Sequence, residues 1–113
     1  MALVKTENCA RIKIFDGPEI NFCKPAVDPM FDSVAAIFRT ATLALVLTGI
    51  GHDGAAGALS IANAGGSVVS QDEATSVVWA MPGAATAAGA CAAVLPIEKI
   101  GPKVSAIFQG VTA

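Results

Sequence analysis

The feature that most constrains the fold is an unbroken apolar run at residues 42–47, T-L-A-L-V-L. Polar and apolar residues do not alternate in it, which is typical of a strand buried on both faces of a parallel sheet. A glycine-rich loop follows, and the alanine-rich segment Gly54–Ala64 predicts a helix that Gly65 and Gly66 close. A buried strand, a loop and a helix in this order predict an α/β fold with a mostly parallel sheet.

The rest of the chain continues this alternation of strands and helices. Asp28 is expected to be the N-cap of a helix, with Pro29 at its first helical position. Residues 20–26 are expected to be extended, since Lys24 precedes a proline. Further strands are expected at residues 10–15, 67–70 and 94–95, and further helices from about 81 to 89 and from 96 to 108.

Composition places the chain among globular domains. Its 113 residues fit one domain, and only 14% are charged, well below the roughly 25% of an average soluble protein. No apolar stretch approaches the roughly 20 residues that a membrane span needs, and the first ten residues do not resemble a signal peptide. We therefore expect a cytoplasmic protein without membrane insertion. The net charge of −2 and the lack of a basic cluster argue against a nucleic-acid partner.

Cysteine and histidine usage argues against a metal site. The three cysteines, Cys9, Cys23 and Cys91, are widely spaced and form no C-x-x-C pair, so we expect small core residues rather than a disulfide framework or a zinc site. His52 is the only histidine. No metal and no cofactor are expected.

The glycine loop allows a dinucleotide-binding interpretation. Gly49, Gly51 and Gly54 have G-x-G-x-x-G spacing after a strand and before a helix, and Asp72 follows the next strand, where an acid could bind a ribose. Asp53 argues against this interpretation. A carboxylate in that turn would itself take the N-terminus of the following helix and repel a pyrophosphate.

The alternative is that Asp53 is the functional group. A carboxylate just past the carboxyl end of a buried strand is suited to orient a histidine in a Ser-His-Asp triad. His52 is its direct neighbour on a tight turn, so we interpret it as a rim residue. No serine lies in a G-x-S-x-G elbow. Asp53 and Asp72 also remain candidates for simple caps of a helix or turn.

Three long stretches of the sequence resemble one known family. They are L-V-L-T-G-I-G-H-D-G-A-A-G, then A-G-G-S-V-V-S-Q-D-E-A-T-S-V-V-W-A-M-P, and then V-L-P-I-E-K-I, preceded by D-G-P-E-I-N-F-C-K-P-A-V-D-P-M-F-D-S-V-A. Together they resemble the catalytic domain of the chemotaxis protein-glutamate methylesterase family, CheB. The resemblance implies a doubly wound three-layer α/β/α domain that hydrolyses glutamate methyl esters on methylated chemoreceptors and deamidates receptor glutamines.

The resemblance also implies roles for individual residues. The triad acid of the family falls on Asp53, and the backbone N–H of Ile50 takes the position associated with the oxyanion site. Ile50 replaces the methionine of the family's T-G-M-G-x-D-G motif, which preserves the N–H but alters the substrate face. Core packing is the default for Trp79 and Met81. The expected pocket rim consists of Thr48, Gly49, Gly51, His52, Trp79 and Met81.

The sequence also departs from the family pattern. The family's serine motif, G-A-S-T-G-G, and its histidine motif, Q-H-M-P, are not found in residues 1–113, nor is a receiver domain. We expect residues 1–113 to form the carboxyl-terminal part of a single catalytic domain whose first strands are missing. Three hypotheses follow: a methylesterase part that needs its other half, an inactive binding module that self-associates through the exposed sheet, and, with less support, a dinucleotide-binding domain.

Overall fold

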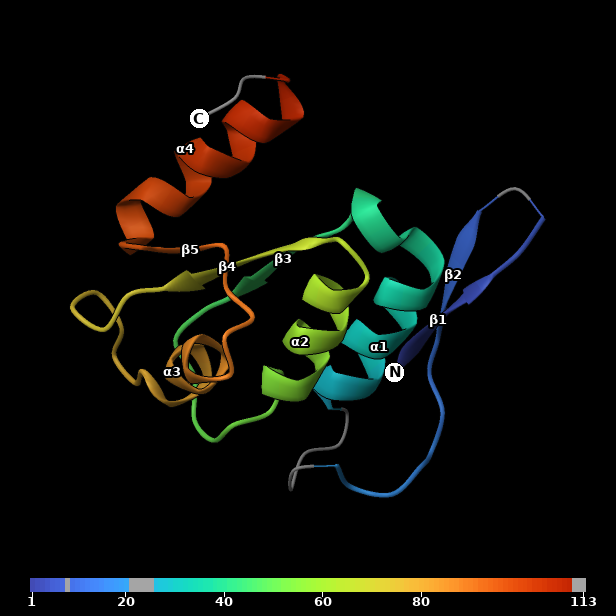
Figure 1. The fold of residues 1–113 in the computed structure, drawn as a ribbon. Coiled ribbons are helices and arrows are strands. Elements are labelled where there is room, and N and C mark those ends of the chain that lie inside the picture. Colours follow the sequence, from blue (N-terminus) through green and yellow to red (C-terminus); the bar gives the residue numbers. More distant parts are fainter. Residues whose placement is uncertain (8, 21–25, 111–113) are drawn as a thin grey trace.

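The fold was analysed in a computed structural model, which describes residues 1–7, 9–20 and 26–110 (Figure 1). A β-hairpin precedes an alternating series of helices and strands. The elements are β1 (Ala2–Lys5), β2 (Ala10–Lys13), α1 (Val27–Phe38), the 3₁₀ turn η1 (Arg39–Ala41), β3 (Leu43–Val46), α2 (Ala55–Asn63), β4 (Ser67–Gln71), α3 (Ala80–Ala87), β5 (Ala93–Leu95) and α4 (Ile97–Phe108).

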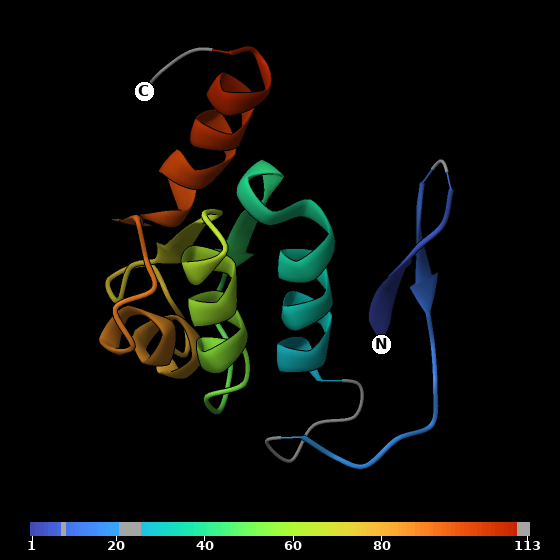
Figure 2. The same ribbon diagram turned by 45° about the vertical axis from the view of Figure 1, so that its right-hand side comes forward.

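The central sheet is parallel, with the strand order β3-β4-β5. Leu43 pairs with Ser67 at one end of the ladder, and Gln71 pairs with Leu95 at the other. Helices α2 and α3 cover one face of the sheet, and α4 lies on the opposite side (Figures 1 and 2). The predicted α/β architecture with a parallel sheet is confirmed. In this sheet β3 is an outer strand, so among the described residues one of its edges has no neighbouring strand.

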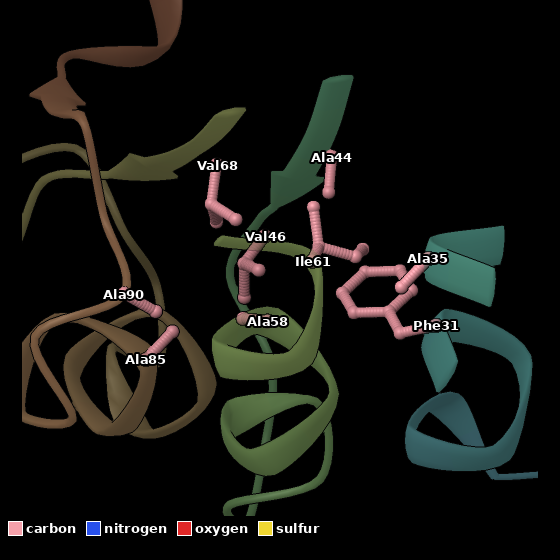
Figure 3. Packing of buried hydrophobic residues seen from close by; sticks show 9 residues of the cluster. All are labelled: Phe31, Ala35, Ala44, Val46, Ala58, Ile61, Val68, Ala85 and Ala90. Carbon is pink, nitrogen blue, oxygen red and sulfur yellow. The ribbon is translucent and has the colours of Figure 1, made fainter. Parts of the chain in front are cut away.

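Small side chains allow the layers to pack closely. Helix α1 lies along α2, and the core between them and the sheet is built largely from alanine, valine and isoleucine around one aromatic ring (Figure 3). Gly57 marks the closest approach, since a Cβ atom there would lie 2.6 Å from Cβ of Phe31. The buried cluster consists of Phe31, Ala35, Ala44, Val46, Ala58, Ile61, Val68, Ala85 and Ala90.

Two predictions about the strands need correction. The strand expected at residues 10–15 ends at Lys13, and it pairs with β1, which the sequence did not predict. The apolar run at 42–47 was expected to be buried on both faces, but Leu45 is 36% exposed and Leu47 is 42% exposed. The face of β3 that carries Leu45 and Leu47 is therefore not fully covered by the described helices.

Helix boundaries agree with the predictions except at Asp28. Helix α1 begins at Val27, and its N-cap is Ala26, so Asp28 lies inside the first turn rather than at the cap. The expected glycine ending of α2 is confirmed, because Gly65 has a φ of +94° and its N–H donates to the Ala62 carbonyl. Most of the extended stretch expected at 20–26 lies outside the described residues.

Two further observations concern the cysteines and membrane insertion. Cys9 is exposed, so its assignment to the core was wrong, whereas Cys91 is half-buried and Cys23 lies outside the described residues. Among the helices of the described ranges, none combines the length and apolar character needed to span a membrane.

Candidate active-site loop

The loop of residues 48–54 leaves the carboxyl end of β3 and leads into α2. Two of its glycines have the left-handed backbone conformation, with φ of +85° at Gly51 and +98° at Gly54. Residues with a Cβ atom rarely adopt these angles, so the glycines allow the chain to turn twice within four residues. Asp53 lies between them and is held at the base of the loop.

The Asp53 side chain points inward and caps a helix. It is only 3% exposed. Its Oδ2 accepts a hydrogen bond from the backbone N–H of Val27 at 2.6 Å, and its Oδ1 accepts one from the N–H of Asp28 at 3.1 Å. A carboxylate at a helix N-terminus satisfies N–H groups that have no partner within the helix and interacts favourably with the helix dipole. Asp53 therefore caps α1, not the helix that directly follows it.

The N-terminus of α2 is capped by Asp28 instead. Its Oδ1 accepts hydrogen bonds from the N–H of Gly54 at 3.0 Å and from the N–H of Gly57 at 2.8 Å. These amides belong to the helix end that would bind a pyrophosphate in a dinucleotide site. A carboxylate already occupies them, so the geometry argues against the dinucleotide interpretation.

The start of the loop is clamped to the segment before α3. The Thr48 hydroxyl donates to the Val78 carbonyl at 2.9 Å and accepts from the Val78 N–H at 2.8 Å. Gly49 donates its N–H to the same carbonyl at 2.9 Å and accepts from the Met81 N–H at 3.1 Å. The peptide groups on both sides of Gly49 are thus held by a neighbouring segment, and the bond to the Gly49 carbonyl fixes the peptide that carries the Ile50 N–H.

Gln71 also holds the start of the loop, and this role was not predicted from the sequence. Its side chain is 2% exposed. The Oε1 atom accepts from the Thr48 N–H at 2.8 Å, and Nε2 donates to the Thr75 carbonyl at 2.7 Å. Trp79 donates its indole N–H to the Gln71 carbonyl at 3.0 Å. A long amide side chain at the end of the short strand S-V-V-S-Q was the signal that could have identified it.

The other predicted residues divide between the rim and the interior. Ile50 is 81% exposed, and His52 and Gly51 are also exposed. Trp79 is half-buried, and Met81 packs against the core, as expected by default. Asp72 accepts hydrogen bonds from the Thr75 N–H and hydroxyl, which caps a local turn.

A small cavity lies beside Asp53 at the open side of β3. Its volume is about 150 Å³, and among the described residues of its lining Asp53 is the only one with a charged side chain. The other lining residues are Val27, Met30, Phe31, Leu45, Val46, Leu47, Gly54 and Met81. Within the parts of the chain that the structure describes, no three His, Cys, Asp or Glu side chains come together in a way that could hold a metal ion.

Comparisons with known proteins agree on one family. The model of the CheB methylesterase family matches residues 1–104. The chain is 56% identical over 110 residues to a protein-glutamate methylesterase/protein-glutamine glutaminase of Rhodopseudomonas palustris (strain BisB5), covering 97% of this chain and 29% of that protein. It is 54% identical to a group 2 operon protein of the same activity from Bradyrhizobium diazoefficiens, covering 97% of this chain and 28% of that protein.

A solved structure matches in three dimensions as well. The Thermotoga maritima CheB methylesterase catalytic domain superposes with a TM-score of 0.87 at 35% identity, covering 90% of this chain and 54% of that chain. The chain thus spans less than a third of the curated relatives named above and about half of the solved catalytic domain. The chain belongs to the CheB methylesterase family.

Proposed function

We propose that this chain acts as the carboxyl-terminal part of a protein-glutamate methylesterase and glutaminase of bacterial chemotaxis. Its substrates are glutamate methyl esters and glutamines in the cytoplasmic region of chemoreceptors. Asp53 serves as the acid of the catalytic triad. The serine and the histidine come from an amino-terminal part of the domain, since neither family motif occurs in residues 1–113.

One observation carries this proposal: a buried carboxylate adjoins an apolar cavity at the open side of the sheet. Asp53 is 3% exposed, and the cavity beside it has a volume of about 150 Å³. Apolar surroundings strengthen the interaction of a carboxylate with an imidazole N–H, because little water competes for the hydrogen bond. A histidine entering from the open edge of β3 would be held by Asp53 in the tautomer that accepts a proton from serine.

The clamped start of the loop supports Ile50 as the oxyanion donor. Gly49 is held on both sides by Val78 and Met81, so the following peptide N–H has a fixed direction. The Ile50 side chain is 81% exposed, which supports a position on the surface that a receptor helix would meet. Preorganised N–H donors of this kind stabilise the negative charge of a tetrahedral intermediate.

The reaction proceeds by acyl transfer. The serine oxygen attacks the ester carbonyl while histidine accepts the serine proton, and histidine then returns that proton to the departing methanol. Water attacks the acyl-enzyme in the same way and releases glutamate. Asp53 stays ionised throughout and stabilises the imidazolium.

The test measures methanol release from a methylated chemoreceptor cytoplasmic fragment. The assay uses this chain alone, the part of the Thermotoga maritima catalytic domain that this chain does not match, and the two together. We expect activity only in the mixture. Asp53→Asn is expected to lower turnover by roughly 10⁴-fold, the loss known for a triad aspartate.

Asp72→Asn is the matched control, because Asp72 also follows a strand but caps only a local turn. It is expected to retain activity. Circular dichroism and a binding titration establish that each variant folds and associates. Undiminished turnover by a folded Asp53→Asn variant would remove Asp53 from the triad.

The exposed face of β3 supports a second candidate, an inactive module that binds a partner or another copy of itself. A groove of about 650 Å³ runs between the β3 region and α4, and Leu45, Ile107 and Phe108 are among its lining residues. Uncovered strand edges and apolar faces promote association. Association of the two parts without methanol release would favour this candidate over the esterase.

A further inference from the structure

We propose that Asp28 is a positioning residue for Asp53, because its carboxylate anchors the loop that carries Asp53. The Asp53 carboxylate caps α1, the helix that contains Asp28, and the Asp28 carboxylate caps α2, the helix that directly follows Asp53. This inference rests on the proposed function for its catalytic meaning. The hydrogen bonds from which it is argued all join described residues.

The two helices lack caps of their own. Helix α1 is preceded by Ala26 and helix α2 by Gly54, and neither N-cap residue makes a side-chain capping hydrogen bond. A helix begins with four N–H groups that have no partner within the helix, and buried N–H groups need one. In this fold each helix N-terminus receives a carboxylate from the other segment. Asp53 accepts from the first turn of α1, and Asp28 accepts from the first turn of α2.

Asp28 acts on the residue directly after Asp53. Its Oδ1 binds the N–H of Gly54 at 3.0 Å, and it binds the N–H of Gly57, one turn further along α2, at 2.8 Å. The same oxygen would lie 3.0 Å from a Cβ atom at position 57, so the glycine gives it room. With glycine at both 51 and 54, the loop has little stiffness of its own. The Asp28 carboxylate therefore supplies the restraint that glycine does not.

The restraint is reciprocal. Asp53 Oδ1 accepts from the N–H of Asp28 itself at 3.1 Å, so moving either residue disturbs both caps. Both side chains are largely buried, Asp28 at 9% exposed and Asp53 at 3%. Water therefore has little access to replace a lost bond. If Asp28 were only a cap for α2, its removal would leave the bond between Val27 and Asp53 unchanged.

Nuclear magnetic resonance on this chain distinguishes the two roles. The N–H of Val27 donates to Asp53 at 2.6 Å, so its proton resonance is expected far downfield. Asp53→Ala gives the reference shift for the broken bond. We expect Asp28→Ala to move the Val27 amide resonance toward that reference, together with those of Gly54 and Gly57. A Val27 resonance that stays in place while only the Gly54 and Gly57 resonances move would overturn the proposal.

Asp28→Asn is the conservative variant, because an amide oxygen at the Oδ1 position still accepts from both glycines. We expect the Val27 resonance to stay near its wild-type position in this variant. If Asp28→Ala does not fold, Asp28→Asn tests the positioning role instead. A displaced Val27 resonance in folded Asp28→Asn would contradict anchoring of the loop through Asp28 Oδ1.

A double-mutant cycle of unfolding stability gives an independent measure of the coupling between Asp28 and Asp53. Each single alanine substitution, Asp28→Ala or Asp53→Ala, is expected to raise the equilibrium constant of unfolding about 10- to 100-fold, as the loss of hydrogen bonds to a charged group does. In the double variant, the increase in the equilibrium constant of unfolding is expected to be about tenfold smaller than the product of the two single increases. The effects of residues that share hydrogen bonds are not additive. Additive effects would mean that Asp28 and Asp53 cap their helices independently.

The catalytic consequence is tested in the reconstituted mixture described above. Because Asp28 is only 9% exposed, Asp28→Ala is expected to lower kcat about 10- to 100-fold with KM unchanged, and Asp28→Asn to restore most of it. An unchanged kcat in Asp28→Ala would overturn the positioning role. If the two wild-type parts associate but release no methanol, the proposed function fails, and the Val27 resonance still decides whether Asp28 holds Asp53.

Discussion

Replacing Gly57 with alanine tests how closely α1 and α2 must pack. Gly57 lies inside α2, where alanine is normally favoured over glycine by about 1 kcal/mol. In this structure, however, a Cβ atom would lie 2.6 Å from Cβ of Phe31 and 3.1 Å from Cα of Asp28. The Asp28 contact is to backbone, so a rotamer change cannot relieve it. We therefore expect Gly57→Ala to be destabilising.

The size of the effect follows from the contacts. Ordinary carbon–carbon contacts are about 3.5–4.0 Å, so the helices must separate by about 1 Å. Overpacking of this kind costs about 1–3 kcal/mol. The same movement stretches the 2.8 Å bond from the Gly57 N–H to Asp28, and a hydrogen bond to a charged group contributes about 1.5–3 kcal/mol. After the gain in helix propensity, the net loss is about 2–4 kcal/mol.

Urea and thermal unfolding followed by circular dichroism measure this loss. For a domain near this size, a loss of about 2 kcal/mol lowers Tm by at least about 8 °C. Ala56→Gly, at the exposed neighbouring position of the same helix, is the control. It measures the propensity difference alone and is expected to cost about 1 kcal/mol. A Gly57→Ala variant as stable as the wild type, with the control behaving as expected, would refute the close packing of α1 on α2.

Three further predictions concern stability and assembly. Gly65→Ala is expected to cost about 1–2 kcal/mol in urea unfolding, because φ at this position is +94°; a neutral effect would contradict the left-handed helix ending. Gln71→Ala is expected to cost about 2 kcal/mol, since it removes the acceptor of the Thr48 N–H and the packing of a side chain that is only 2% exposed, and a change below about 0.5 kcal/mol would show that the clamp is dispensable. Leu45→Glu is expected to change stability by less than about 1 kcal/mol but to prevent association with the amino-terminal part in a binding titration. Leu59→Glu, on α2 and similarly exposed, should still associate, and equal binding by both variants would place the interface elsewhere.

The sequence predicted correctly those features of the fold that depend on residues close together in the chain. Glycines at 51 and 65 predicted turns and a helix ending, and both have the positive φ that such positions need. The order of strands and helices followed from apolar runs and from proline and glycine positions. These features depend on backbone dihedral angles and on burial, which neighbouring residues largely determine.

The site was predicted only in part. The spacing of the loop singled out Asp53 as a residue with a special role, and it is indeed buried at the end of β3. Its partners were not predictable, because the amides that it binds lie 25 and 26 residues earlier in the chain. Gln71 was missed for a related reason. Its role as acceptor for the Thr48 N–H depends on the packing of the loop after β3 against the end of β4.

The sequence by itself thus determined the succession of elements from α1 onward, the positions of the turns and the family to which the chain belongs. Only the tertiary structure decided which carboxylate caps which helix and which face of β3 remains open. Helix N-termini are chemically alike, so Asp28 satisfies the amides of α2 as readily as those of its own helix, and the choice follows from the packing of α1 on α2 around Gly57. The apolar run at β3 likewise indicates a strand suited to burial, whereas the placement of the helices on the sheet decides how far each of its faces is covered.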